Sequence, residues 1–175
     1  VAAIIGGSKV STKIDVINFL LKKMDIIIIG GAMANTFVAA KGLDVGKSLF
    51  EKECIDLAKE LIEKSQNNNC NLILPTDFIV SKNLKKHAEY TTANFDSLPH
   101  NMMALDIGPK SIELINKNIN NCKTILWNGP LGAFETYPFD KGTNKVASHV
   151  SSLTKQKKIL SVAGGGDTVS ALNNA

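Results

Sequence analysis

Six short apolar runs rich in β-branched residues divide the chain. They occupy residues 1–5, 25–29, 71–74, 103–107, 124–127 and 159–162. Because their apolar positions are continuous rather than alternating, they predict strands that are buried on both faces of a parallel sheet.

Helical stretches lie between most of these runs. In residues 11–23 the apolar side chains Ile14, Ile17 and Leu21 step by three and four, which places them on one face of a helix that Ser11 could cap. Similar patterns predict helices at residues 33–40, 53–66, 111–121 and 145–153, and from about Asp167 onward. We therefore expect one doubly wound α/β domain over residues 1–175, a Rossmann-like three-layer sandwich with a mainly parallel six-stranded sheet.

Composition narrows the class of protein. The 175 residues are 44% hydrophobic and 21% charged, which is ordinary for a soluble globular domain. No apolar run approaches the roughly 18 residues of a membrane span, so we expect no membrane partner. Cys54, Cys70 and Cys122 are widely spaced and lack metal-ligand spacing, which favours a reducing cytoplasm over a disulfide framework.

The charge pattern argues against a nucleic-acid partner. The net charge is +4, but every basic residue is Lys and none is Arg, so the guanidinium fork that reads guanine is absent. The lysines near residues 82–86 and 155–158 are interpreted as solvated surface. The chain also opens inside an apolar strand and stops inside a predicted helix, so we expect a piece of a longer protein, truncated at both ends.

Two glycine-rich segments follow predicted strands and open helices. The segment GGSKVSTK at residues 6–13 offers free backbone N–H groups to phosphate, with Lys9 and Lys13 on one side if the helix has begun by Lys9. A glycine-rich turn with two exposed lysines fits equally well. The segment GGGDT at residues 164–168 is more specific, because three glycines exceed what a turn needs and Asp167 with Thr168 can ligate Mg²⁺ and phosphate, although both are also ordinary N-cap residues.

A third segment, WNGPLGAFE at residues 127–135, supplies an amide, an apolar wall and a carboxylate that suits paired ribose hydroxyls. In isolation Glu135 is more often a surface carboxylate.

The segment at residues 42–48 imitates a phosphate-binding Walker loop, but its first glycine position holds Lys41 and it follows a helix, so we reject it. The dinucleotide fingerprint Gly-x-Gly-x-x-Gly is absent from the sequence, and the three histidines are isolated.

Seven segments in order along the whole chain resemble the carboxyl-terminal domain of the phosphoglycerate kinase family. They are GGSKVSTK at 6–13, IIGGAMA at 28–34, GKSL at 46–49, LPTDF at 74–78, DIGP at 106–109, WNGP at 127–130 and GGGDT at 164–168. The resemblance implies reversible phosphoryl transfer between 1,3-bisphosphoglycerate and Mg-ADP, which gives 3-phosphoglycerate and ATP in glycolysis.

The resemblance also implies residue roles. Lys9, Gly165 and Gly166 would serve the transferred phosphoryl group, and Asp167 would bind Mg²⁺. The nucleotide contacts would be Lys13, Asn128, Gly164 and Thr168 at the phosphates, Glu135 at the ribose, Gly7, Ser8, Gly30, Gly31, Leu49, Leu105 and Ala133 around the adenine, and Pro130 as a further contact. This fits phosphoryl transfer, in which catalysis is positioning plus charge stabilisation.

Departures from the family pattern are confined to the adenine slot. Ser8 stands where Ala is usual, Ala32 where a third Gly is common, and Ala133 where a larger Val is frequent. The family's amino-terminal domain, which holds 3-phosphoglycerate and contributes an arginine, is absent from this chain. We therefore expect the chain alone to bind ADP or ATP without turnover, and the intact protein to be a monomer.

Two alternatives from other classes are a non-catalytic adenine-nucleotide-binding domain and the dinucleotide-binding half of an oxidoreductase. Asp167 after three glycines, together with Lys9 and Lys13, favours phosphoryl chemistry over both.

Overall fold

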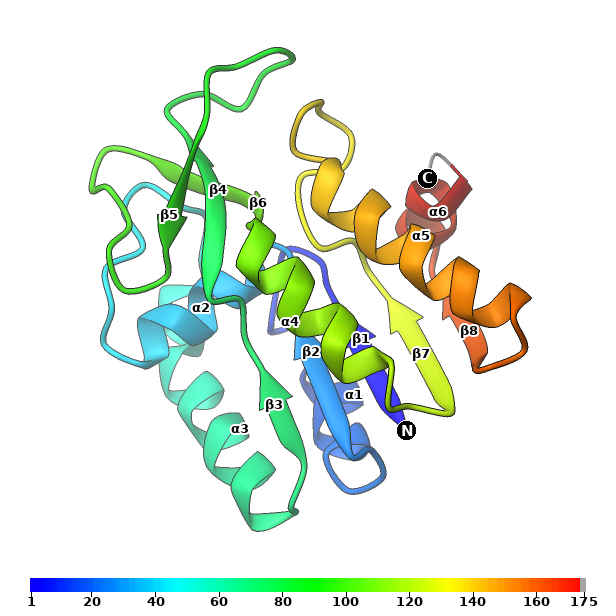
Figure 1. Cartoon of the computed structure of the whole chain (residues 1–175). Helices are drawn as coiled ribbons and strands as arrows, with labels where there is room; N and C mark the ends of the chain where they lie inside the picture. The colour runs from blue at the N-terminus through cyan, green and yellow to red at the C-terminus, as the bar shows by residue number, and fades with distance from the viewer. Residues whose placement is uncertain (174–175) are drawn as a thin grey trace.

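The computed structural model describes residues 1–173 and contains two sheets (Figure 1). The larger sheet is entirely parallel, with the strand order β3-β2-β1-β7-β8. Its strands are β1 (Ala2–Ile5), β2 (Ile26–Ile29), β3 (Asn71–Ile73), β7 (Thr124–Asn128) and β8 (Leu160–Gly164). The predicted parallel α/β fold is confirmed, but the sheet has five strands and not the six expected.

The sixth predicted strand belongs to a second, antiparallel sheet. β6 (Met103–Ile107) pairs with β4 (Asp77–Ser81), which pairs with β5 (Thr91–Asn94) on its other edge. Neither β4 nor β5 was predicted. β6 has the continuous apolar character of a parallel strand because its residues are largely covered, although its partner runs in the opposite direction.

Helices cover both faces of the larger sheet (Figure 1). They are α1 (Ile14–Leu20), α2 (Met33–Ala40), α3 (Ile55–Asn67) after a 3₁₀ turn η1 (Lys52–Cys54), α4 (Pro109–Ile119), α5 (Lys141–Lys155) and α6 (Gly166–Asn173). Alternate residues of β1 divide the core: Ala3 and Ile5 pack with α1, α2 and α3, whereas Ala2 and Ile4 pack with α4 and α5. This is the predicted three-layer sandwich.

Two details of the predicted helices are wrong. α1 begins at Ile14 and not near Ser11, so Ser11 does not cap it and Lys9 is outside the helix. α5 starts four residues before the predicted 145, because its first turn lacks apolar periodicity. The last predicted helix reached Ala175, and residues 174 and 175 lie outside the described residues.

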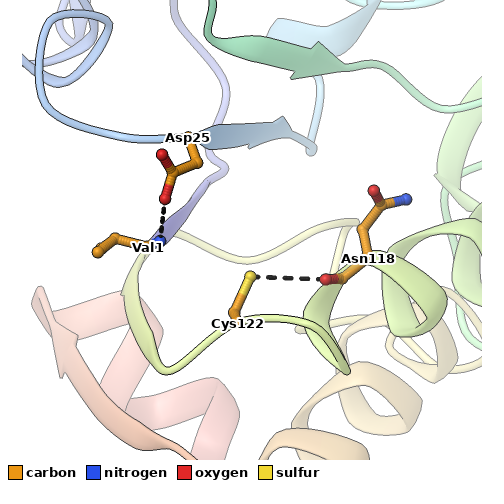
Figure 2. Close-up of polar contacts among 4 residues, drawn as sticks. All are labelled: Val1, Asp25, Asn118 and Cys122. Atoms are coloured by element: carbon orange, nitrogen blue, oxygen red, sulfur yellow. Dashed lines mark hydrogen bonds and ion pairs between the residues drawn. The ribbon is translucent and has the colours of Figure 1, made fainter.

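The amino-terminal edge of the sheet carries local polar contacts. Figure 2 shows the Val1 amino group paired with the Asp25 carboxylate, and the Cys122 thiol directed at the Asn118 carbonyl, 3.5 Å away. All three cysteines are free and buried, and burial raises the pKa of each thiol. Among residues 1–173, no helix is both long and apolar enough to cross a membrane.

Candidate functional site

The strand order creates a crevice at the carboxyl ends of β1 and β7. In the sheet, β2 and then β3 lie on one side of β1, and β7 and then β8 lie on the other. Ligands of doubly wound sheets bind at this switch point, where the connections on the two sides diverge. Gly6 and Gly7 follow β1 here, and Gly129 and Pro130 follow β7.

The backbones of these two loops touch. The amide of Gly6 donates to the Asn128 carbonyl at 2.8 Å, and the amide of Gly7 donates to the Pro130 carbonyl at 3.2 Å. Gly31, after β2, has φ +68°, and a Cβ placed on it would lie 2.4 Å from the Gly7 carbonyl oxygen. Glycine is therefore required at position 31 for both its conformation and its close approach.

A cavity of about 340 Å³ opens above this floor. Predicted site residues that line it are Gly7, Ser8, Gly31, Leu49, Leu105, Pro130, Ala133, Glu135 and Asp167. They come from loops after β1, β2, α2 and β7, from β6 and from the first turn of α6. A compact, largely apolar slot with a carboxylate at its edge can accept a flat, hydroxyl-bearing ligand.

A polar cluster joins the cavity on the side of β8. The Lys13 ammonium contacts the Asn128 side-chain oxygen, and the Asn128 amide donates to the Gly164 carbonyl at 2.8 Å. The next residues, Gly165 and Gly166, lead into α6, whose first turn presents N–H groups that lack partners within the helix. This end of the site has the positive character that attracts an anion.

Three predicted residues take positions that the sequence did not specify. Thr168 is 1% exposed, and its hydroxyl accepts a hydrogen bond from the Gly129 amide at 2.6 Å. Gly30 lies behind the cavity wall against the Leu131 side chain, and Lys9 is exposed at the outer end of its turn. The structure thus brings Lys13, Asn128 and Gly164 together, and among residues 1–173 the Lys9 side chain makes no hydrogen bond with them.

Several cavity residues were missed by sequence reasoning, and Leu84 and Asp106 are the most informative. Leu84 lines the slot from the loop between β4 and β5, yet it sits among lysines that suggested only solvated surface. Asp106 lies on β6 and is 3% exposed; burial raises its pKa to about 8, against hydrogen bonds from the amides of Gly142 and Ile107. A carboxylate inside an apolar strand was the available signal for Asp106.

The described residues supply few side chains that could ligate a metal ion. Among residues 1–173, no group of three or more His, Cys, Asp or Glu side chains could hold a metal ion. Asp167 borders the cavity as a single carboxylate. Such a donor set fits Mg²⁺, which proteins commonly bind through one or two carboxylates together with the phosphates of a substrate.

Together the fold and the site define the class of this chain, a doubly wound α/β domain with a ligand crevice at its switch point. The family model described as phosphoglycerate kinase matches residues 1–175. The chain therefore belongs to the phosphoglycerate kinase family.

Individual relatives agree with this assignment. The chain is 51% identical to the phosphoglycerate kinase of Methylorubrum extorquens strain PA1 and 52% identical to that of Brucella melitensis, over all 175 residues and 44% of each relative. The solved phosphoglycerate kinase of Coxiella burnetii matches 99% of the chain with a TM-score of 0.93 at 42% identity, over 44% of that structure. The enzyme from Pyrococcus horikoshii matches 99% with a TM-score of 0.80 at 26% identity, over 43% of its chain. The chain spans less than half the length of these relatives.

Proposed function

We propose that the chain is the nucleotide-binding domain of a phosphoglycerate kinase, which transfers a phosphoryl group reversibly between 1,3-bisphosphoglycerate and ADP. The observation that carries the proposal is the continuity of the site. Asp167 lines the slot, and Gly164, close to it in sequence, accepts a hydrogen bond from Asn128, which Lys13 also contacts. A base slot that adjoins such a cluster suits the base and the phosphates of one nucleotide.

In this proposal the adenine occupies the 340 Å³ slot between the backbone of Gly7 and Gly31 and the side chains of Leu49 and Ala133. Ser8, Leu105 and Pro130 complete the slot, and Gly30 supports it from behind. The Glu135 carboxylate, exposed at the slot's edge, accepts hydrogen bonds from the ribose hydroxyls.

The phosphates lie toward Lys13, Asn128 and the segment 164–166. Nucleotide binding would redirect the Lys13 ammonium from the Asn128 oxygen toward phosphate, because an ion pair with phosphate is stronger than a bond to a neutral amide. Thr168 holds the Gly129 turn and is proposed to contribute at the same end. Asp167 would hold Mg²⁺, which supplies charge neutralisation of the phosphates when bound.

During transfer, Lys9 follows the migrating phosphoryl group, and the amides of Gly165 and Gly166 stabilise its equatorial oxygens. Lys9 is free to do so because its side chain is exposed beyond the glycine turn. 3-Phosphoglycerate would be held by a part of the protein outside this chain. We expect the intact protein to act as a cytoplasmic monomer, without nucleic-acid or membrane partners.

Two measurements on the full-length gene product test the proposal. Calorimetry should detect one site for Mg-ADP, and a coupled assay should detect ATP formation that depends on 1,3-bisphosphoglycerate. Nucleotide binding without turnover would favour the non-catalytic nucleotide-binding alternative. A folded protein that binds no adenine nucleotide would overturn the assignment of the site.

A further inference from the structure

A short segment, residues 48–51, joins the base side of the site to the phosphate side, and we call it the strap. Leu49 lines the slot, and Glu51 contacts the turn that carries Lys9 and Lys13. Three hydrogen bonds hold the strap. The Ser48 hydroxyl accepts from the Ala104 amide at 2.8 Å, and the Leu49 carbonyl accepts from the Asn35 side chain at 3.0 Å. The Glu51 amide donates to the Thr36 hydroxyl at 3.0 Å.

Both oxygens of the Glu51 carboxylate accept hydrogen bonds from Ser11. The Ser11 amide donates to Oε2 at 3.0 Å, and the Ser11 hydroxyl donates to Oε1. Burial alone would raise the pKa of Glu51, but these hydrogen bonds and one from the Val10 backbone outweigh it and hold the pKa below its usual value, with a smaller contribution from the charge of Lys9. Glu51 is therefore ionised at neutral pH and forms charge-assisted hydrogen bonds.

Ser11 sits midway between the two lysines in a turn that is stiff within itself. The Thr12 hydroxyl donates to the Lys9 carbonyl at 3.0 Å, and the Lys13 amide donates to the Val10 carbonyl at 2.9 Å. Fixing Ser11 consequently fixes the direction of the whole turn. The helix α1 holds only its N-cap residue Lys13, whose carbonyl accepts from the Ile17 amide at 2.9 Å, so residues 9–12 need other anchors. The other anchor is Val10, which is fully buried.

We propose that Glu51 is a positioning residue for the phosphate end of the site. It clamps the turn at residues 9–13 to the strap, so that Lys9 and Lys13 are held at the height of the bound phosphates. This inference rests on the proposed nucleotide-binding function and goes beyond it, because Glu51 lines no part of the slot and would touch neither base nor phosphate.

The test compares adenosine with ADP in the full-length protein by calorimetry. Glu51→Ala should weaken Mg-ADP binding about tenfold, or about 1.4 kcal/mol, and leave adenosine binding within twofold of wild type. Adenosine has no phosphates for Lys9 and Lys13 to bind, so the loss of affinity should be confined to ADP. A general loss of structure would weaken the binding of both ligands. Glu51→Gln should restore most of the affinity, because its oxygen can accept from the Ser11 amide and its NH₂ can donate to the Ser11 hydroxyl.

Two further variants serve as controls. Glu53→Ala removes the same charge from an exposed neighbour in η1 and should leave both ligands unaffected. Ser11→Ala removes only the hydroxyl bond, and should weaken ADP about threefold without changing adenosine. This milder variant decides the matter if Glu51→Ala does not fold.

Several results would overturn the inference. Wild-type ADP affinity in Glu51→Ala would mean that burial of Val10 alone holds the turn. An equal loss for adenosine and ADP would make Glu51 a general support of the pocket, and a loss in Glu53→Ala equal to that in Glu51→Ala would make the effect one of overall charge. Failure of the wild-type protein to bind either ligand would instead refute the proposed function.

Discussion

Replacement of Gly31 by Ala should destabilise the protein and close the slot. Gly31 has φ +68°, a conformation that costs an L-residue about 1–2 kcal/mol. The added Cβ would also lie 2.4 Å from the Gly7 oxygen and 2.6 Å from the Gly7 nitrogen, where ordinary contact begins near 3.4 Å. The floor of the slot must therefore move by about 1 Å, at an overpacking cost of about 1–3 kcal/mol.

The Gly7 carbonyl oxygen, which the added Cβ would displace, also contributes to the position of α2, so the substitution should affect both stability and binding. The Gly7 carbonyl accepts the Met33 amide at 3.0 Å and so holds the start of α2 beside the slot. We expect Gly31→Ala to lose about 2–5 kcal/mol of unfolding free energy in urea denaturation. We also expect it to bind Mg-ADP at least tenfold more weakly in calorimetry.

Gly42→Ala is the matched control. Gly42 has φ +80°, but nothing lies within 4 Å of an added Cβ and the residue is outside the slot. It should lose only the conformational cost of about 1–2 kcal/mol and keep its affinity for ADP. If Gly31→Ala were no less stable than Gly42→Ala and bound ADP normally, the close contact of the loops after β1 and β2 would be irrelevant to the site.

Three further predictions concern single side chains. Thr168→Val should lower the unfolding free energy by about 1–3 kcal/mol, because it leaves the Gly129 amide unpaired. Thr168→Ser keeps the hydroxyl and should not lower it. Equal melting temperatures for the two variants would contradict this. Lys9→Ala in the full-length protein should lower kcat on the order of 10²–10³-fold with a smaller effect on nucleotide KM in steady-state assays, and near-normal kcat would make Lys9 a mere surface lysine. The pKa of Asp106 rises from 3.8 to about 8 on folding, so the folded state binds more protons in this window and the unfolding free energy should fall as pH rises through it. Urea titrations at several pH values should show that Asp106→Asn flattens this dependence, and an unchanged slope would assign it to other groups.

The parallel sheet was predictable because its strands carry continuous apolar runs, most of which are followed by glycine. The second sheet was not. β4 begins with the buried Asp77, whose carboxylate accepts from the backbone amides of Lys110 and Ser111 at the start of α4, and such a residue does not look like a strand position. β5 is short and largely exposed, so it carries no apolar pattern.

The site was predictable to the level of its loops, because parallel strands place their carboxyl ends at one edge of the sheet. This rule brings Lys13 to Asn128 across 115 positions of sequence. Side-chain directions were not predictable. Whether Thr168 faces a ligand or the Gly129 amide depends on how the loops after β7 and β8 pack, and Leu84 reaches the slot only through the course of the loop after β4.

A crystal structure of the full-length protein with Mg-ADP would locate the nucleotide. We expect adenine in the slot against Leu49 and Ala133, ribose hydroxyls on Glu135, and phosphates at Asn128 and the segment 164–166. ADP bound elsewhere, or in the slot with its phosphates directed away from this glycine segment, would refute the proposed nucleotide site.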